Sequence, residues 1–205
     1  MPVRERLIAC WDARAADYTR RTAPVERRFL AESRRWVCEQ AEGDTLELAV
    51  GTGLNLRHYS PGVRLTALDW SERMVQTTRR SLDGSRQVAL VRADAMALPF
   101  ADGRFDTVVC TFSLCCVPDE RAVIGEAVRM LRPGGSLLLA DHIVAATRTV
   151  RLLQRLAELV TVPLHGEHFT RRPLDTVRRS GLDIVQTQRL APYGAIERLH
   201  ARKPA

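Results

Sequence analysis

The stretch ELAVGTGLN, residues 47–55, combines one carboxylate with two glycines that stand one residue apart. It closes an apolar run typical of a buried strand, so the glycines lie where that strand turns into the next element. A glycine has no Cβ and lets a ligand approach the backbone closely. Three ligands are commonly held by such a turn: a dinucleotide, a nucleoside triphosphate and S-adenosylmethionine (SAM).

Two of these ligands fit the residues less well. A P-loop needs a lysine followed by Ser or Thr after the turn, and the chain's single lysine is Lys203. The dinucleotide pattern G-x-G-x-x-G is met at Gly51 and Gly53, but its third position is Leu56. An NAD-dependent oxidoreductase therefore stays as an alternative enzyme class, and a non-catalytic SAM-binding module as an alternative outside enzymes.

Two further carboxylates stand where later strands are expected to end. Asp69 closes RLTALDW (64–70) and Asp94 closes QVALVRAD (87–94). Ligands of open α/β sheets bind at the carboxyl ends of the strands, so we expect these side chains to face one site together with Glu47. The alternative for Asp69 is that it caps the helix beginning at 71.

Two histidines are candidate catalytic residues. His142 follows an expected strand, and His168 lies in a segment expected to cover the site. Imidazole titrates near neutral pH, so either side chain could act as a general base. The HGEH at 165–168 lacks the H-E-x-x-H spacing of a zinc helix, and we predict no metal site. The five cysteines are odd in number and without C-x-x-C spacing, which favours reduced, mostly buried thiols.

The elements that must position these residues alternate between strand and helix, which indicates a parallel sheet. We expect strands at 45–50, 64–70, 87–94, 105–112 and 136–143. Helices are expected over 4–41, from NLRHY (55–59), and over 71–82, 119–131, 147–162 and 170–180. Ser71 is the expected N-cap of its helix. Two final strand-like runs predict a terminal hairpin.

The glycine turn resembles the first motif of class I SAM-dependent methyltransferases, E/D-x-G-x-G-x-G, with Ala49 in place of the first glycine. We expect a negative φ at Ala49, in a relaxed turn that tolerates the methyl group. ADAMALPF (93–100), FDTVVCTFSLCCVPD (105–119) and LRPGGSLLLADH (131–142) match the later motifs of these enzymes in order and spacing. The resemblance covers about residues 44–143.

This resemblance implies an α/β fold: a Rossmann-like, seven-stranded mixed sheet with helices on both faces and one antiparallel strand. It implies a single SAM-dependent methyltransferase domain over 1–205, with an N-terminal helical cap (1–43) and a core (44–205) that carries an inserted cover helix (147–162). SAM is the implied cofactor and S-adenosylhomocysteine its product.

The resemblance also implies roles for individual residues. Asp69 would bind both ribose hydroxyls, Asp94 the exocyclic amine of adenine, Ala95 the ring through its N–H and Met96 the ring face, while Tyr18 would fold over the cofactor. The remaining expected cofactor contacts are Glu47, Ala49, Gly51, Gly53, Asn55, Trp70, Met74, Thr111 and Phe112.

The flanking segments narrow the implied acceptor. WDARAADYTRRT (11–22) looks like a segment of the quinone-biosynthesis methyltransferases and of bacterial phosphatidylethanolamine N-methyltransferases, and HGEHFTRRPL (165–174) is similar to one in alkyl-thiol methyltransferases. The D/N-P-P-Y/F signature of nucleic-acid amino-methylating enzymes is replaced by TFSL (111–114). We therefore expect methylation of N, S or O, and less readily C, on a small molecule, with phospholipid N-methylation as an alternative and no nucleic-acid partner.

Charge and composition add weaker expectations. The net charge is +7 and the arginines are dispersed in pairs, which is typical of solvated helix faces and leaves a weak peripheral membrane contact open. No apolar stretch is long enough for a membrane span, and the N-terminus has no apolar signal core. We expect a cytoplasmic protein, monomeric or homodimeric.

Overall fold

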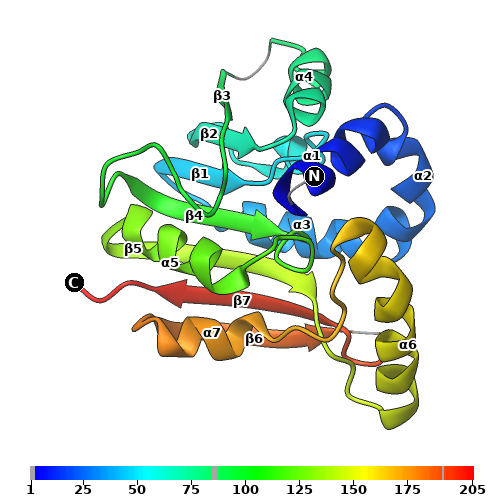
Figure 1. Cartoon of the computed structure of the whole chain (residues 1–205). Coiled ribbons are helices and arrows are strands. Elements are labelled where there is room, and N and C mark those ends of the chain that lie inside the picture. The colour runs from blue at the N-terminus through cyan, green and yellow to red at the C-terminus, as the bar shows by residue number, and fades with distance from the viewer. Residues whose placement is uncertain (1–2, 85–86, 191) are drawn as a thin grey trace.

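A seven-stranded sheet forms the centre of the computed structural model, which describes residues 3–84, 87–190 and 192–205. The strand order is β3-β2-β1-β4-β5-β7-β6 (Figure 1). Neighbours from β3 to β5 pair in parallel, whereas β7 is antiparallel to both β5 and β6. The strands are β1 (Asp44–Leu48), β2 (Arg64–Asp69), β3 (Val88–Arg92), β4 (Phe105–Thr111), β5 (Leu131–His142), β6 (Asp183–Leu190) and β7 (Ile196–Arg202). The expected mixed sheet and terminal hairpin are confirmed.

Side chains alternate between two hydrophobic clusters because successive residues of a strand point to opposite faces. Leu137 of β5 packs into one cluster and Leu138 into the other. On β4, Val108 and Val109 divide in the same way, which explains the continuous apolar run of this central strand. The first cluster includes α5 (Glu120–Met130) and α7 (Pro173–Arg179), and the second includes α3 (Ala31–Cys38), so helices cover both faces.

The N-terminal helical segment is broken, contrary to the expectation of one helix over 4–41. It forms α1 (Val3–Arg14), α2 (Tyr18–Val25), a π-helical turn (Glu26–Leu30) and α3. Pro24 lies inside α2 and cannot donate a backbone hydrogen bond, and the wider π turn follows directly. This break lets α1 leave α3 and lie beyond the carboxyl ends of the central strands (Figure 1).

The other helices match their expected positions with one exception. The helix expected from NLRHY is only a 3-10 turn, Leu56–His58, and Tyr59 is already extended. Pro61 favours extended backbone just before it, which opposes a helix here. α4 (Glu72–Ser81) has its predicted N-cap, since Ser71 accepts a hydrogen bond from Met74 N–H at 3.1 Å. α6 (Arg148–His165) follows β5. Among the described residues, no helix is long and apolar enough to cross a membrane.

Candidate active site

A cavity of about 800 Å³, its open mouth included, lies at the carboxyl ends of β1, β2, β3 and β4. Eleven of the fourteen cofactor contacts expected from the sequence line it: Tyr18, Ala49, Gly51, Asp69, Trp70, Met74, Asp94, Ala95, Met96, Thr111 and Phe112. The sheet therefore brings residues from four separate strand ends to one place.

The turn after β1 is strained, and the expected negative φ at Ala49 is wrong. Ala49 has φ +53°, in the left-handed region that disfavours a Cβ. The turn is held by hydrogen bonds from Val50 N–H to the carbonyl of Leu68, at 2.8 Å, and from Gly53 N–H to the carbonyl of Val50, at 3.0 Å. Phe112, just beyond β4, is also left-handed, with φ +51°. Both residues line the cavity, where strained backbone commonly accompanies function.

The two glycines of the turn do different things. A Cβ added to Gly51 would meet no atom of the described residues within 4 Å, so this position borders open space. A Cβ on Gly53 would lie 3.0 Å from Leu56 Cδ1 and 3.2 Å from Thr78 Cγ2. Gly53 therefore allows α4 to pack closely and does not line the cavity, whereas Gly51 leaves room for a ligand.

Asp69 holds the rim of the glycine turn. Its carboxylate accepts hydrogen bonds from the N–H groups of Gly51, at 3.0 Å, and Ser71, at 2.9 Å. Burial raises the pKa of Asp69 to about 6, although these hydrogen bonds oppose the shift. At neutral pH the carboxylate is ionised and can accept further donors from the cavity.

Asp94 is also tied to neighbouring groups. Its Oδ1 accepts from Met96 N–H at 2.9 Å, and its Oδ2 lies 2.9 Å from Arg4 Nε of α1. The side chain of Asp94 is 12% exposed and that of Arg4 is 57% exposed. Arg4 thus ties α1 to the loop after β3 at the cavity wall.

Three expected cofactor contacts, Glu47, Gly53 and Asn55, are not among the cavity-lining residues. Glu47 is buried and accepts hydrogen bonds from Asn55 Nδ2, at 2.8 Å, and Tyr59 Oη, at 2.9 Å. Burial raises its pKa to about 7. Asn55 Nδ2 also donates to Thr111 Oγ1, so these residues join β1 to β4 beneath the cavity.

Arg34 is a lining residue that no sequence motif marks. This buried side chain of α3 pairs with Glu26 at 3.0 Å and donates to Thr111 Oγ1 at 2.6 Å. Its guanidinium also lies 4.8 Å from the centre of the Phe112 ring. Arg34 is the one cationic side chain among the lining residues found in the described part of the chain. Thr111 is 77 residues away along the chain, so local spacing could not single out this arginine.

The aromatic cover of the cavity comes from the N-terminal helices. The Trp11 and Tyr18 rings meet edge to face, with centroids 6.0 Å apart, and both line the cavity. Burial raises the pKa of Tyr18 to about 12, so its phenol stays protonated. Thr19 Oγ1 donates to Thr52 Oγ1 at 2.8 Å, which joins α2 to the glycine turn. Trp11 belongs to the N-terminal motif but is not among the predicted contacts, because helical spacing alone does not tell which aromatic faces a ligand.

Neither candidate catalytic histidine lines the cavity, but His142 contacts Phe112 of its wall. The His142 ring lies 5.1 Å from the Phe112 ring and 6.3 Å from the Phe169 ring, between centroids. The backbone N–H of His168 donates to the carbonyl of Cys115 at 2.8 Å. Burial lowers the pKa of both imidazoles, which keeps them neutral at pH 7 with a lone pair available.

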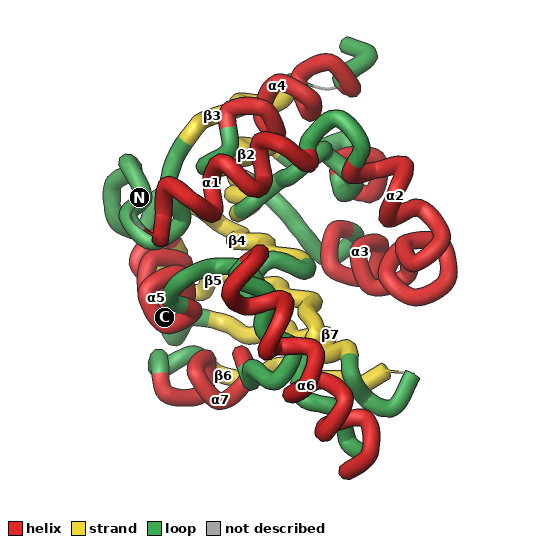
Figure 2. Tube along the Cα trace, turned by 45° about the vertical axis from the view of Figure 1, so that its right-hand side comes forward, coloured by secondary structure: helices red, strands yellow, loops and turns green. Residues whose placement is uncertain are grey.

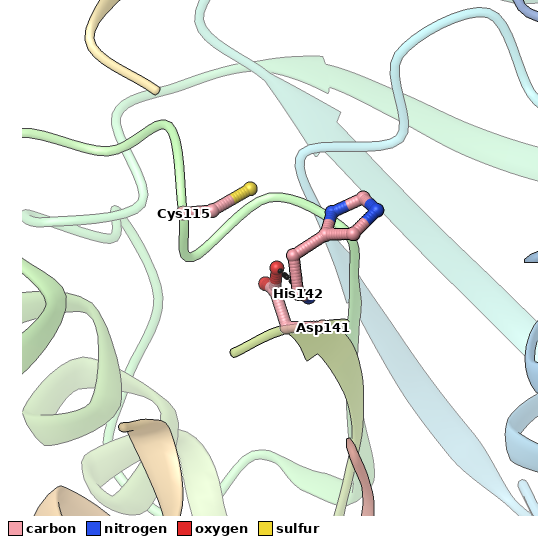
Figure 3. Close-up of side chains that lie close together, drawn as sticks. All are labelled: Cys115, Asp141 and His142. Carbon is pink, nitrogen blue, oxygen red and sulfur yellow. Dashed lines mark hydrogen bonds between the residues drawn. The ribbon is translucent and has the colours of Figure 1, made fainter. Parts of the chain in front are cut away.

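Cys115, Asp141 and His142 lie together at the ends of β4 and β5 (Figure 3), with potential ligand atoms within 4.8 Å of one another. The Asp141 carboxylate already accepts backbone N–H groups of Ser113, Leu114 and His142 at 2.7–3.0 Å. We interpret Asp141 as the tie that fixes the loop after β4, which bears the lining residues Ser113 and Cys116.

The chain resembles known proteins in both sequence and fold. The family described as "Methyltransferase domain" matches residues 46–139. The human thiol S-methyltransferase TMT1B is 32% identical over 153 residues, which cover 67% of this chain and 63% of that protein. Phosphatidylethanolamine N-methyltransferase of Cereibacter sphaeroides is 39% identical over 103 residues, 49% of this chain and 51% of the relative. Demethylmenaquinone methyltransferase of Clavibacter sepedonicus is 38% identical over 111 residues, which cover 54% of this chain and 44% of that protein.

A solved structure agrees with this picture. The crystal structure of a methyltransferase of unassigned activity from Bacillus halodurans C-125 superposes with a TM-score of 0.72 at 20% identity, over 86% of this chain and 99% of that one. The strand order and the structural match define a Rossmann-like α/β fold with a cavity at the carboxyl ends of its strands. The sequence matches make it more specific: the chain belongs to the class I SAM-dependent methyltransferases, the family that uses SAM as cofactor. The chain spans 63% of the length of the human relative and about half of the other two.

Proposed function

We propose that this chain transfers the methyl group of SAM to a nitrogen, sulfur or oxygen of a small-molecule acceptor. The observation that carries this proposal is the convergence of the motif residues, from four strand ends, on one cavity beside an open glycine. When bound, SAM supplies a methyl group on a positively charged sulfur, and the chain's residues need to bind, orient and exclude water.

The charges around the cavity fit the parts of SAM. Asp69 and Asp94 are carboxylates that can accept from the ribose hydroxyls and the adenine amine, as the family resemblance implies. Arg34 is a buried cation that can attract the carboxylate of the methionine part. Met96, Met74 and Trp70 add apolar surface for the adenine ring.

Phe112, Cys116 and Val117 also line the cavity, which favours an acceptor with an apolar part. The three relatives carry names for thiol, phosphatidylethanolamine and demethylmenaquinone methylation. Their shared property on the acceptor side is that each acceptor is small or lipid-like. We propose this acceptor class, with phospholipid N-methylation as the second candidate.

The test is a two-part measurement. Calorimetry with S-adenosylhomocysteine and with NAD should show binding of the first and none of the second; NAD binding alone would favour the oxidoreductase. Labelled SAM incubated with amines, thiols, phenols and phosphatidylethanolamine should then identify the acceptor by transferred label. Binding without turnover of any acceptor would support a non-catalytic SAM-binding module.

Between the two histidines, His142 is the better placed to act on the acceptor, because its ring contacts Phe112 of the cavity wall. His168, whose place in the cover segment favours it from the sequence, is hydrogen-bonded through its backbone to Cys115, which is not a lining residue. A general base contributes roughly 10²–10⁴-fold to a rate. Changing the catalytic histidine, His142 or His168, to Ala should therefore lower the turnover of the enzyme by at least about 10²-fold and leave its affinity for S-adenosylhomocysteine unchanged. A loss below about tenfold in both variants would mean that neither acts as a base. A cytoplasmic location and a monomeric or homodimeric state stay predictions.

A further inference from the structure

α6 turns its apolar side away from the rest of the protein. Six large apolar side chains of this helix are between 53% and 73% exposed: Leu152, Leu153, Leu156, Leu159, Val160 and Leu164. None of the residues of α6, all of them described, is buried. Figure 2 shows α6 in the foreground, and none of the described elements lies over its outward side. A contiguous apolar surface of this kind commonly marks an interaction site.

The inward side of α6 is polar, which is the reverse of an ordinary surface helix. Gln154 bonds the backbone of Ala145 and Ile143 at 2.8 and 2.9 Å. Glu158 Oε1 accepts from Thr170 N–H at 2.7 Å, and Thr161 Oγ1 donates to the carbonyl of Glu167 at 2.9 Å. These specific hydrogen bonds fix the orientation of the helix, so the exposed leucines are a built feature of the fold.

Cationic side chains border the apolar side. Arg148 and Arg155 are exposed, and each precedes a leucine of the apolar side, Leu152 or Leu159, by four residues. Residues four apart are neighbours on a helix surface, so both arginines lie beside the leucines. The whole chain also carries a net charge of +7. A second copy of this chain would bring like charges together, whereas an anionic lipid surface would pair with them.

We propose that α6 docks this protein onto an anionic lipid membrane, with its leucines in the boundary between headgroups and acyl chains and Arg148 and Arg155 against the headgroups. Interfacial helices combine an apolar side with flanking cations in this way. Here the side turned away from the lipid is fastened to the protein instead of facing water.

The docked helix would lie close to the cavity. His165 Nδ1 of α6 is 3.7 Å from Cys10 Sγ of α1, and Trp11 of α1 lines the cavity. If the proposed methyl transfer holds, acceptors dissolved in the membrane would be near the site. The docking itself does not depend on that activity.

The experiment is co-sedimentation of the whole chain with vesicles of phosphatidylcholine alone or mixed with phosphatidylglycerol. We expect clear binding to the mixed vesicles. L156Q/L159Q should bind at least about tenfold more weakly, because glutamine cannot replace the apolar contact of the two leucines with the lipid. R148Q/R155Q should lose about fivefold per arginine on the mixed vesicles only. V185Q, on the exposed edge strand β6, is the matched control and should bind like the unaltered chain.

Glutamine has a helix propensity close to those of leucine and arginine, and far-ultraviolet circular dichroism with S-adenosylhomocysteine titration checks that each variant folds. The proposal is overturned if the unaltered chain does not co-sediment with either kind of vesicle, or if L156Q/L159Q binds the mixed vesicles as tightly as V185Q. A dimer in sedimentation velocity that L156Q/L159Q dissociates, without vesicle binding, would overturn it too and assign the apolar side to a second copy.

Discussion

At the scale of single residues, the positive φ of Ala49 lowers the stability of the folded chain. Its left-handed backbone disfavours any L-residue by roughly 1–2 kcal/mol, and glycine would avoid that penalty. We expect Ala49→Gly to raise the free energy of unfolding by about 1 kcal/mol in chemical denaturation. Ala67→Gly is the matched control, because it removes the same methyl group from buried strand β2 and should destabilise. If Ala49→Gly destabilises the chain as Ala67→Gly does, the inference that the backbone of Ala49 is strained is wrong.

Asp69 is the residue through which pH should act on cofactor binding. Asp69→Asn should weaken S-adenosylhomocysteine binding by about 1.5–3 kcal/mol, the range for hydrogen bonds to a charged group. The pKa of Asp69 is raised to about 6, so the carboxylate gains a proton and loses acceptor strength as the pH falls below that value. Calorimetry should show affinity dropping below about pH 6 in the unaltered chain and a flatter profile in the variant.

A carboxylate outside the cavity provides the comparison for Asp69. Asp106 is the second residue of β4, at the amino end of this strand and so away from the cavity, and it accepts a hydrogen bond from Asp44 N–H at 2.7 Å. Asp106→Asn should leave the affinity and its pH profile unchanged. Equal affinity of Asp69→Asn and Asp106→Asn would remove Asp69 from the binding site.

At the scale of elements, β1 is joined to β4 through a carboxyl group that is buried on every side. The pKa of Glu47 is raised to about 7 from its usual 4.5 because burial disfavours the charged form. The folded chain therefore binds this proton more tightly than the unfolded chain, and stability falls as pH rises from about 4.5 to 7. Above about pH 7 this contribution stays constant.

Glu47→Gln isolates that effect because glutamine keeps an oxygen acceptor without titrating. The difference in unfolding free energy between the unaltered chain and the Glu47→Gln variant should change by about 3 kcal/mol between pH 4.5 and 7, since each pKa unit corresponds to about 1.36 kcal/mol. Denaturant titrations at several pH values measure this difference. A difference that does not vary with pH would show that Glu47 titrates normally.

The strand pattern could be predicted from the sequence because each central strand is a compact apolar run ending at a motif residue. The strain at Ala49 could not, since the φ angle follows from the hydrogen bonds of Val50 and Gly53 to chain segments around it. Arg34 was missed because its partner Thr111 is distant in sequence. The periodicity of α6 predicted a helix but not its orientation, which Gln154 and Glu158 set through hydrogen bonds.

At the scale of the whole molecule, α1 is the element that joins the cavity to α6. It reaches the cavity wall through Arg4 and Trp11, and it reaches the segment of α6 through Cys10 and Arg14, the latter 3.9 Å from Glu167. Among the described side chains of this helix, only Leu7 is buried. Elements with little buried apolar surface open locally at small free-energy cost.

Because Leu7 is its single buried side chain among those described, we expect α1 to control how often the cavity opens. Apart from Leu7, polar contacts such as Arg4 with Asp94 hold α1 beside the cavity. We expect α1 to detach transiently when a cofactor enters, and a bound cofactor should make such detachment rarer. Trypsin cuts after arginine, and Arg4, Arg6 and Arg14 offer it sites on this helix. Cleavage there should slow severalfold in S-adenosylhomocysteine and stay unchanged in NAD. The rate of tryptic cleavage, followed on a gel, thus reports how often α1 detaches. A cleavage rate that S-adenosylhomocysteine does not change would mean that ligands enter without moving α1.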